Sequence, residues 1–398
     1  MSLTCGLIGL PNAGKSTLFR AISAAHAEIA AYPFTTIAPS VGVVRIPDRR
    51  LEAIAAVTRP ERVVAATLEL VDIAGLVRGA HSGEGLGNQF LGQIREVDAL
   101  LHVVRCFGGP VPHVEGGIDP ERDAAIVDTE LLLADLATVS RARAQASPRA
   151  RAGDRAAREE EAVLAALEAH LAHEGPARTF ARPGAAPEAA QTIARLHLLT
   201  SRPVLYIANL DDTDPEAAAR LAVVERVAAR AGTAAFGLFG KLELELSELP
   251  DTDAAQFLES LGLNERGLPR LVRACHTLLT LRTFFSIASA EVRAWDVPAG
   301  TRAPQAAGRI HTDMERGFIR AEVVACDDLI ASGSLASARE RGLVRLEGRD
   351  YEIRDGDVIT FRFAAEPGTP TRRLSAPTIR ATAAAADRGT GARRSRQL

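Results

Sequence analysis

The sequence Gly9-Leu-Pro-Asn-Ala-Gly-Lys-Ser16 lies between a short apolar run, Thr4 to Gly9, and a helical pattern from Lys15 to about Ala25. It matches the spacing GxxxxGK[ST], in which glycines let backbone N–H groups wrap around phosphate oxygens. The N-terminus of the following helix adds the positive end of its dipole. The order strand, loop, helix therefore predicts a phosphate-binding loop, and a chance glycine turn is the weaker alternative.

Two residues of this loop carry specific chemistry. Lys15 would reach the β- and γ-phosphates of a nucleotide and act in catalysis, and the Ser16 hydroxyl would bind Mg²⁺. Only Lys15 and Lys241 of the 47 basic residues are lysine. A lysine kept in such a chain indicates a place where a compact ammonium is needed and a planar guanidinium does not fit.

Further apolar runs follow along the chain, several of them separated by helical patterns. This alternation predicts an α/β fold with a mostly parallel, doubly wound sheet. The runs are Val41 to Ile46, Ala65 to Asp72, Ala99 to Arg105, Pro203 to Asn209 and Ala234 to Leu238.

The rest of the chain changes character twice. Residues 1–125 and 200–280 are expected to form the nucleotide domain, interrupted by a helical, coiled-coil-like insertion over residues 126–199 with turns near 147–153 and 175–187. Short β-like runs predict a small β-rich domain over residues 281–364. Residues 365–398 are rich in arginine and lack apolar periodicity, which predicts a disordered basic tail.

A second set of candidate residues completes the phosphate site. Asp72, at the end of an apolar run, would hold Mg²⁺ through water, and the Gly75 N–H would sense the γ-phosphate. Thr36, in the segment Tyr32-Pro-Phe-Thr-Thr36, is the candidate for completing the Mg²⁺ shell, although it could be an ordinary loop residue. On the base side, Asn209-Leu-Asp-Asp212 and Phe239-Gly-Lys241 occupy the places of two base-binding loops, and a plain surface role for Lys241 stays open.

Composition excludes several classes of protein. The chain has 398 residues, 47% hydrophobic and 24% charged, with a net charge of −3, which excludes wholesale disorder and a global basic field. Four scattered cysteines argue against a zinc ribbon or a secreted disulfide framework and favour reduced core thiols. No apolar run approaches a membrane span, so we expect a cytoplasmic protein without membrane contact, most simply a monomer.

With these motifs in order, the chain resembles the YchF or Obg-like ATPases, a branch of the Obg group of translation-factor GTPases. The most specific matches are Gly9 to Thr17, Asp72 to Val77 followed by Arg78 to Asn88, His113 to Pro120, and Glu291 to Trp295 leading to Ala303 to Thr312. The resemblance implies a TGS domain at residues 281–364 and association with ribosomes, expected through the large subunit and its RNA. It implies that the loop residues Asn12, Ala13, Gly14, Lys15, Ser16 and Thr17 hold the phosphates, that Ser16 and Thr36 hold Mg²⁺, and that Leu210 holds adenine through its backbone.

The base-reading loop departs from the family pattern and leaves two readings open. Asp212 stands where the family has Glu, and an aspartate that accepts hydrogen bonds from guanine would favour GTP. Leu210, however, replaces the lysine of a guanine reader, and the family matches favour ATP. We favour ATP. Phe239 also stands where the last loop has Ser, so the geometry of that loop is open.

The expected mechanism is a slow hydrolytic switch. Leu76 directly follows Gly75, where small GTPases have a glutamine that orients water. His81 is the polar candidate to replace it, with a solvated bystander as the alternative. Asn12 could bind K⁺ beside the phosphates or simply hold the loop. The sequence thus predicts a ribosome-binding, Mg²⁺-dependent ATPase in translation or stress response; a GTPase of the Obg group and a nucleotide-gated binding module with little turnover are the alternatives.

Overall fold

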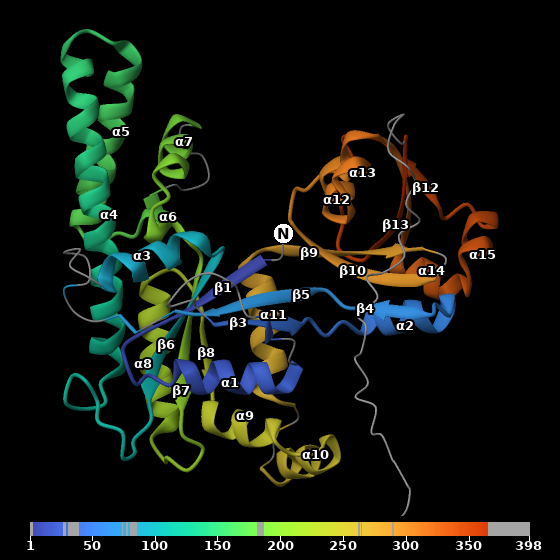
Figure 1. Ribbon diagram of the computed structural model, residues 1–398, viewed down its shortest axis with the longest axis horizontal. Coiled ribbons are helices and arrows are strands. Elements are labelled where there is room, and N and C mark those ends of the chain that lie inside the picture. The colour runs from blue at the N-terminus through green and yellow to red at the C-terminus, as the bar shows by residue number, and fades with distance from the viewer. Residues whose placement is uncertain are drawn as a thin grey trace, which may run out of the picture.

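The computed structural model describes residues 3–26, 29–30, 40–73, 75–76, 79, 86–180, 187–261, 263, 265–288 and 290–364. The described residues form two β-sheets and a long helical hairpin that extends away from the first sheet (Figure 1). Thr36, His81 and the predicted tail lie outside the described residues.

The first sheet carries the phosphate loop, and its described strands follow the order β2-β3-β5-β1-β6-β7-β8. The five neighbouring strands β5, β1, β6, β7 and β8 are parallel. At one edge of the sheet, β3 pairs antiparallel with β5, and β2 pairs antiparallel with β3. The predicted α/β fold class is therefore confirmed. The strands are β1 (Leu3–Ile8), β2 (Ile29–Ala30), β3 (Ser40–Arg45), β5 (Thr67–Asp72), β6 (Ala99–Cys106), β7 (Val204–Leu210) and β8 (Ala235–Leu238).

Helices cover both faces of this sheet, which explains why β6 and β7 are buried along their whole length. On one face, α1 and α11 pack against Leu7, Leu101 and Ile207. On the other, α3, α8 and the start of α4 pack against Ile8, Val104 and Tyr206. The helices are α1 (Lys15–His26), α3 (Leu86–Glu96), α8 (Ala217–Arg230), α9 (Gly240–Ser247), α10 (Asp251–Ser260) and α11 (Gly267–Leu278).

The helical insertion is a hairpin of α4 (Pro120–Arg151) and α5 (Arg155–Ala172), followed by α6 (Ala177–Phe180), α7 (Pro187–Leu196) and the short 3₁₀ turn η2 (Leu199–Ser201). Asp119 and Asp154 cap α4 and α5, each accepting a hydrogen bond from a backbone N–H. Helix α4 begins six residues before the predicted insertion and packs its first half on the sheet. It also continues through Pro148 to Arg151, where a turn was expected; the turn is shorter and falls at residues 152–154.

The second sheet has the order β12-β11-β13-β9-β10-β4 among the described strands. The predicted β-like runs correspond to β9, β11, β12 and β13, while β10 and four short helices were not predicted. The elements are β9 (Leu281–Ile287), β10 (Glu291–Pro298), α12 (Ala303–Ile310), α13 (Thr312–Arg316), β11 (Phe318–Ala325), α14 (Cys326–Ser332), α15 (Leu335–Glu340), β12 (Arg345–Glu347) and β13 (Asp357–Phe363).

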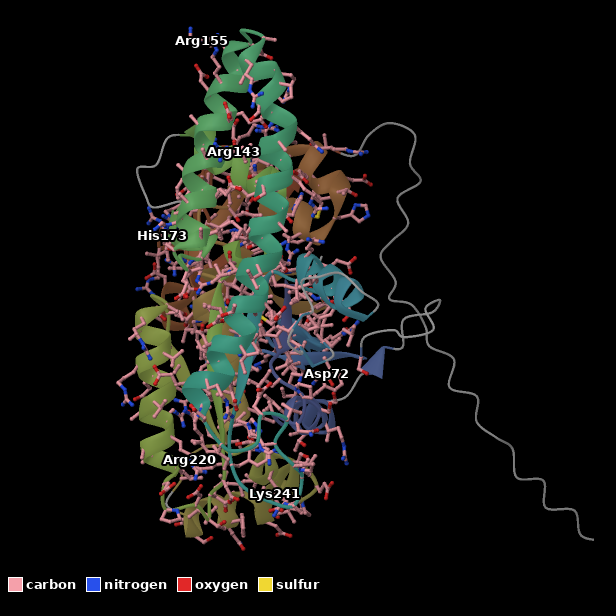
Figure 2. The ribbon with its side chains drawn as sticks, turned by 90° about the vertical axis from the view of Figure 1, so that its left-hand side faces the viewer. Asp72, Arg143, Arg155, His173, Arg220 and Lys241 are labelled. Carbon is pink, nitrogen blue, oxygen red and sulfur yellow. The ribbon has the colours of Figure 1, made fainter. Side chains whose placement is uncertain are left out.

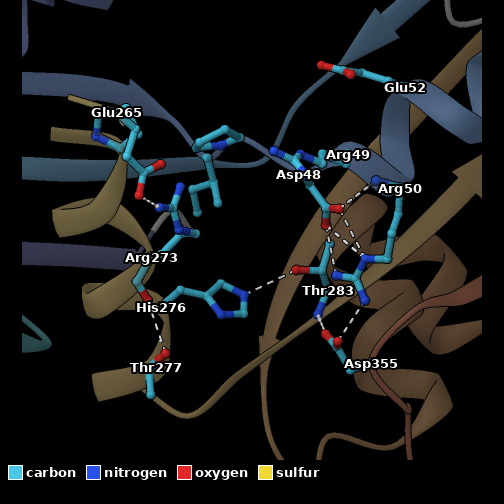
Figure 3. Close-up of a pocket in the computed structure, with 13 residues that line it drawn as sticks. Asp48, Arg49, Arg50, Glu52, Glu265, Arg273, His276, Thr277, Thr283 and Asp355 are labelled. Atoms are coloured by element: carbon cyan, nitrogen blue, oxygen red, sulfur yellow. Dashed lines mark hydrogen bonds and ion pairs between the residues drawn. The ribbon is translucent and has the colours of Figure 1, made fainter. Parts of the chain in front are cut away.

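The first and second sheets are joined through β4 (Arg62–Val64), which pairs in parallel with β10, and through α2 (Arg49–Thr58). Arg50 of α2 donates to Asp355 of the C-terminal domain at 2.7 Å and lies over the Phe285 ring. A groove of about 1010 Å³ runs along this junction, with His276 of α11 bonded across to Thr283 of β9 (Figure 3).

Two observations bear on earlier expectations. The cysteines Cys5, Cys106, Cys275 and Cys326 are buried and free, as expected for core thiols. Among the helices that the structure describes, none is both long enough and apolar enough to cross a membrane.

Candidate functional site

Between β1 and α1, the phosphate loop contains three residues with positive φ angles. Gly9, Asn12 and Gly14 have φ angles of 145°, 62° and 91°. A Cβ atom at Gly14 would lie 2.1 Å from Nδ2 of Asn209, so this position accepts glycine only. The asparagine at position 12 is one of the few residue types that adopt the left-handed region at low cost.

Lys15 begins α1 and is held inside the loop, with 7% of its surface exposed. Its Nζ donates to the carbonyl oxygens of Gly9 at 3.1 Å and Leu10 at 2.9 Å. An ammonium has three N–H donors, so one remains for a phosphate oxygen. Burial lowers the pKa of Lys15 to about 8, and the nearby Asp72 carboxylate opposes that shift.

Ser16 and Asp72 meet at the mouth of the loop. The Ser16 hydroxyl donates to Oδ2 of Asp72 at 3.0 Å. Burial raises the pKa of Asp72, while the Ser16 hydrogen bond and the Lys15 charge lower it. Hydroxyl and carboxylate oxygens are the donors that Mg²⁺ prefers when phosphates and water complete its shell, so this pair fits the ion. Among the described residues there is no cluster of three or more His, Cys, Asp or Glu that would indicate another type of metal site.

The segment after Asp72 returns to the phosphate loop. A Cβ atom at Gly75 would lie 2.9 Å from the backbone nitrogen of Pro11, so the two chains approach as closely as glycine allows. The Leu76 N–H donates to the carbonyl of Gly9 at 3.1 Å. The Leu76 side chain is 1% exposed and packs in the hydrophobic core, so it is neither polar nor directed to solvent.

Asn209, the penultimate residue of β7, ties two loops together. Its Nδ2 donates to the Ala13 carbonyl at 3.0 Å, and its Oδ1 accepts the Gly240 N–H at 3.1 Å. A Cβ atom at Gly240 would lie 2.7 Å from the same Oδ1. The side chain therefore fixes the phosphate loop to the first residue of α9.

The other predicted base-side residues differ in accessibility. The Leu210 side chain is buried in the core. Asp212 is exposed, and it is the neighbouring Asp211 that accepts from Thr213. The Lys241 side chain is 83% exposed, with Nζ 3.6 Å from Glu245, and its charge contributes to lowering the pKa of Asp211. Lys241 is thus near this loop but on the surface, in the lower part of Figure 2 together with Arg220.

Two residues that the sequence did not single out for this site lie beside the phosphate loop. Arg105, at the end of β6, donates to the Asn12 carbonyl at 3.4 Å, and Pro112 accepts a hydrogen bond from Asn12 Nδ2 at 3.2 Å. The only sequence signal was a charged residue inside an otherwise apolar run. The loop after β6 thereby contacts the back of the phosphate loop.

Comparisons with known proteins agree with this geometry. A family model described as 50S ribosome-binding GTPase matches residues 4–165, and the model YchF-GTPase_C, described as a protein of unknown function (DUF933), matches residues 281–364. The chain is 46% identical to the ribosome-binding ATPase YchF of Bacillus subtilis, over 91% of this chain and 100% of that protein. The chain belongs to the YchF family. The YchF of Haemophilus influenzae, also called a ribosome-binding ATPase, is 47% identical over 91% of this chain and 99% of its own length.

Solved structures of the YchF family and beyond share the fold. The Schizosaccharomyces pombe YchF GTPase superposes with a TM-score of 0.77 at 31% identity, covering 91% of this chain and 98% of that one. A GTP-binding protein from Pyrococcus horikoshii gives a TM-score of 0.57 at 18% identity over 91% of this chain and shows the fold alone. The resemblance to the YchF family and the assignment as a P-loop NTPase are therefore confirmed.

Proposed function

We propose that this YchF-family chain is a Mg²⁺-dependent ATPase that binds ribosomes and uses slow hydrolysis as a switch in translation or stress response. The observation that carries the proposal is the combined placement of Lys15, Ser16 and Asp72 at one mouth of a glycine-constrained loop. Relatives at 46% and 47% identity are named ribosome-binding ATPases, which supports both the reaction and the partner.

The phosphate-binding roles follow from the donors that point into the loop. Residues Asn12 to Thr17 would hold the phosphates, with Lys15 contributing its remaining N–H. Ser16 and Asp72 would hold Mg²⁺, and Thr36 would complete its shell. When bound, Mg²⁺ neutralises negative charge that develops on the phosphate oxygens. A K⁺ ion beside Asn12 belongs to the same proposal, although the Asn12 amide donates to Pro112 and so also holds the loop.

The geometry of the predicted base-binding loop at the end of β7 supports ATP over GTP. Leu210 stands where a guanine reader has a lysine, and its side chain is buried, so this position offers no cationic side chain to a base; adenine would be held through backbone atoms. Asp212 is exposed and its neighbour Asp211 binds within its own loop. GTP stays the alternative, because an exposed Asp212 could still meet a guanine edge and one solved relative is titled a GTPase.

Hydrolysis would be slow because Leu76 is buried and cannot orient water. We propose His81 as the residue that takes that role. If no residue does, the protein is a nucleotide-gated binding module in which turnover only resets the switch. The long hairpin offers an extended surface for a large partner; Arg143 near its middle and Arg155 at its tip lie on this surface, each paired with a glutamate of the hairpin (Figure 2). This protein would bind the large ribosomal subunit and its RNA in the cytoplasm, and it would do so as a monomer.

A competition experiment tests the nucleotide, and co-sedimentation tests the partner. ATP and GTP compete for a fluorescent ADP analogue in buffer with Mg²⁺ and K⁺. We expect ATP to bind more tightly than GTP; GTP that binds tenfold more tightly, with the advantage lost in Asp212→Ala, would overturn the choice of base. Ribosomes added in stoichiometric amounts should pellet the protein and stimulate phosphate release, and release that stays at the basal rate would support the binding module.

A further inference from the structure

Arg105 is a buried cation, and its hydrogen bonds to residues that the structure describes all go to main-chain carbonyl oxygens. It is 4% exposed at the end of β6. Its Nη2 donates to Val111 at 2.8 Å and its Nε to Phe107 at 3.2 Å, while Nη1 donates to both Pro112 and Asn12 at 3.4 Å. Its guanidinium also lies 4.6 Å from the centre of the Phe107 ring.

This environment is costly for a charge. Burial lowers the pKa of Arg105, and the charge of Asp123 only partly opposes this effect. A buried cation with neutral acceptors is costly, and the carbonyl bonds and the contact with the Phe107 ring offset part of this cost. The same bonds constrain the backbone: Nε and Nη2 bind the loop 107–112, while Nη1 binds both Pro112 of that loop and Asn12 of the phosphate loop.

Asn12 is the residue through which the hydrogen bonds of Arg105 affect the phosphate site. Its φ of 62° puts it in the left-handed region, a conformation that costs about 1–2 kcal/mol for most residues. The bond from Arg105 to the Asn12 carbonyl fixes the orientation of the peptide between Asn12 and Ala13. The Asn12 side chain makes a second connection between the phosphate loop and the loop 107–112, because its Nδ2 and Arg105 Nη1 both donate to the Pro112 carbonyl.

We propose that Arg105 is a positioning residue for nucleotide binding, which sets the conformation of the phosphate loop without touching the nucleotide. The proposal deepens the proposed function and rests on it. Lysine cannot replace this arginine, because an ammonium is a point donor and cannot span four carbonyls arranged around a planar fork. The expected consequence is a specific loss of phosphate affinity in Arg105→Lys, although the charge is kept.

Arg122 provides a matched control on the same stretch of chain. It donates to the Gly117 carbonyl and to Asp123, and no bond to the phosphate loop is seen in the part of the chain that the structure describes. Arg122→Lys therefore removes a bond to the segment between β6 and α4 while leaving Asn12 in place.

The experiment measures the Kd of a fluorescent ADP with Mg²⁺, in a buffer free of K⁺, for wild type, Arg105→Lys and Arg122→Lys. We expect at least a tenfold rise in Kd for Arg105→Lys and less than a twofold change for Arg122→Lys. The ³¹P resonance of the bound ADP β-phosphate should shift in Arg105→Lys only. Equal losses in the two variants would assign the effect to loop integrity and overturn the inference.

Asn12→Gly gives a second test that does not depend on the folding of Arg105→Lys. Glycine keeps the left-handed backbone and its carbonyl but removes the tie to Pro112, so we expect a two- to tenfold rise in Kd. If both residues act through Pro112, the double variant loses less than the product of the single losses, and a full product would contradict the proposal. A wild-type protein that binds no ADP would overturn the proposed function and this inference with it, whereas unchanged affinity in Arg105→Lys would overturn only the inference.

Discussion

The two lysines of this arginine-rich chain have opposite environments. Lys15 is buried between two carbonyl acceptors in a tight loop, where a planar guanidinium would not fit. Lys241 extends into solvent beside Glu245. Scarcity of lysine therefore pointed to one residue that is buried in the phosphate loop and to a second, Lys241, for which a plain surface role stays open.

Substitution of each lysine separates these roles. Lys15→Ala removes a charge-assisted contact worth about 1.5–3 kcal/mol, so nucleotide affinity should fall by roughly ten- to a hundredfold. Lys241→Ala should lose much less, because its exposed charge is screened by solvent. Isothermal titration measures both, with circular dichroism to verify the fold. Wild-type affinity in a folded Lys15→Ala variant would contradict the phosphate assignment.

The buried thiols give a prediction about reactivity and pH. Burial raises the pKa of Cys106 from 9.0 to about 12, and the pKa of Cys5 also rises, with its hydrogen bond to Cys275 as the largest cause. We expect a thiol reagent to leave these groups unmodified at pH 8 until the protein is denatured. Because the unfolded thiols ionise near pH 9 and the folded ones do not, their contribution to stability is lost as pH rises above about 9. Rapid labelling of Cys106 in the native protein would contradict this account.

At the scale of elements, an element or a contact could be predicted where it depends on residues that are close together in the sequence. Strands β6 and β7 were found because both of their faces are apolar, and the phosphate loop was found because its spacing is local, whereas the two-residue strand β2 was not predicted. Strand β10 was missed since it mixes charged and apolar residues and buries Asp296 against Thr283. Arg105 was missed because its contact with Asn12 joins positions 93 residues apart. No pattern within a short window carries such information.

Helix α4 is longer than expected because tertiary packing overrides a proline. Pro148 lies in its last turns, where the missing N–H costs a backbone hydrogen bond. Pro148→Ala should therefore stabilise the tip of the hairpin by about 1–3 kcal/mol. Hydrogen exchange of residues 149–151 measures the gain, with the exposed neighbour Gln145→Ala as a control that leaves the backbone bonds unchanged. Exchange that is no slower in Pro148→Ala would show that the tip gains nothing from this bond.

At the scale of the whole molecule, the two domains share hydrophobic core. Ile54 of α2 and Phe285 of β9 belong to one buried cluster with Leu7 of the first sheet. The polar part of the junction is centred on Asp355, which accepts from Arg50 and from the Thr283 N–H at 2.8 Å. Strand β4 adds three residues to the second sheet, a pairing that no local sequence pattern could have indicated.

Asp355 makes this junction sensitive to acid. Burial tends to raise its pKa, but the bonds from Arg50 and Thr283 lower it more, so the pKa lies below the ordinary 3.8. Its contribution to stability is therefore present above about pH 4 and lost as pH falls through the folded-state pKa. Asp355→Asn should cost about 0.5–1.5 kcal/mol at pH 7, a difference that shrinks toward pH 3.

Chemical denaturation across this pH range measures the difference from wild type. Asp350→Asn is the control, because Asp350 pairs with Arg302 on the open surface. A stability difference for Asp355→Asn that stays constant down to pH 3 would contradict the role of the ionised carboxylate.

The base of α4 lies one short loop away from the phosphate site. Asn12 bonds to Pro112, and the next residue, His113, bonds through Nε2 to Asp123 in the first turn of α4 at 2.6 Å. The 32 residues of this helix span about 48 Å. The first half of this length packs on the first sheet, and the second half extends beyond it over about 24 Å. A tilt of about 5° where the helix leaves the sheet would therefore move the hairpin tip by about 2 Å, so a small change beside the phosphate loop would be larger at the far end of the hairpin.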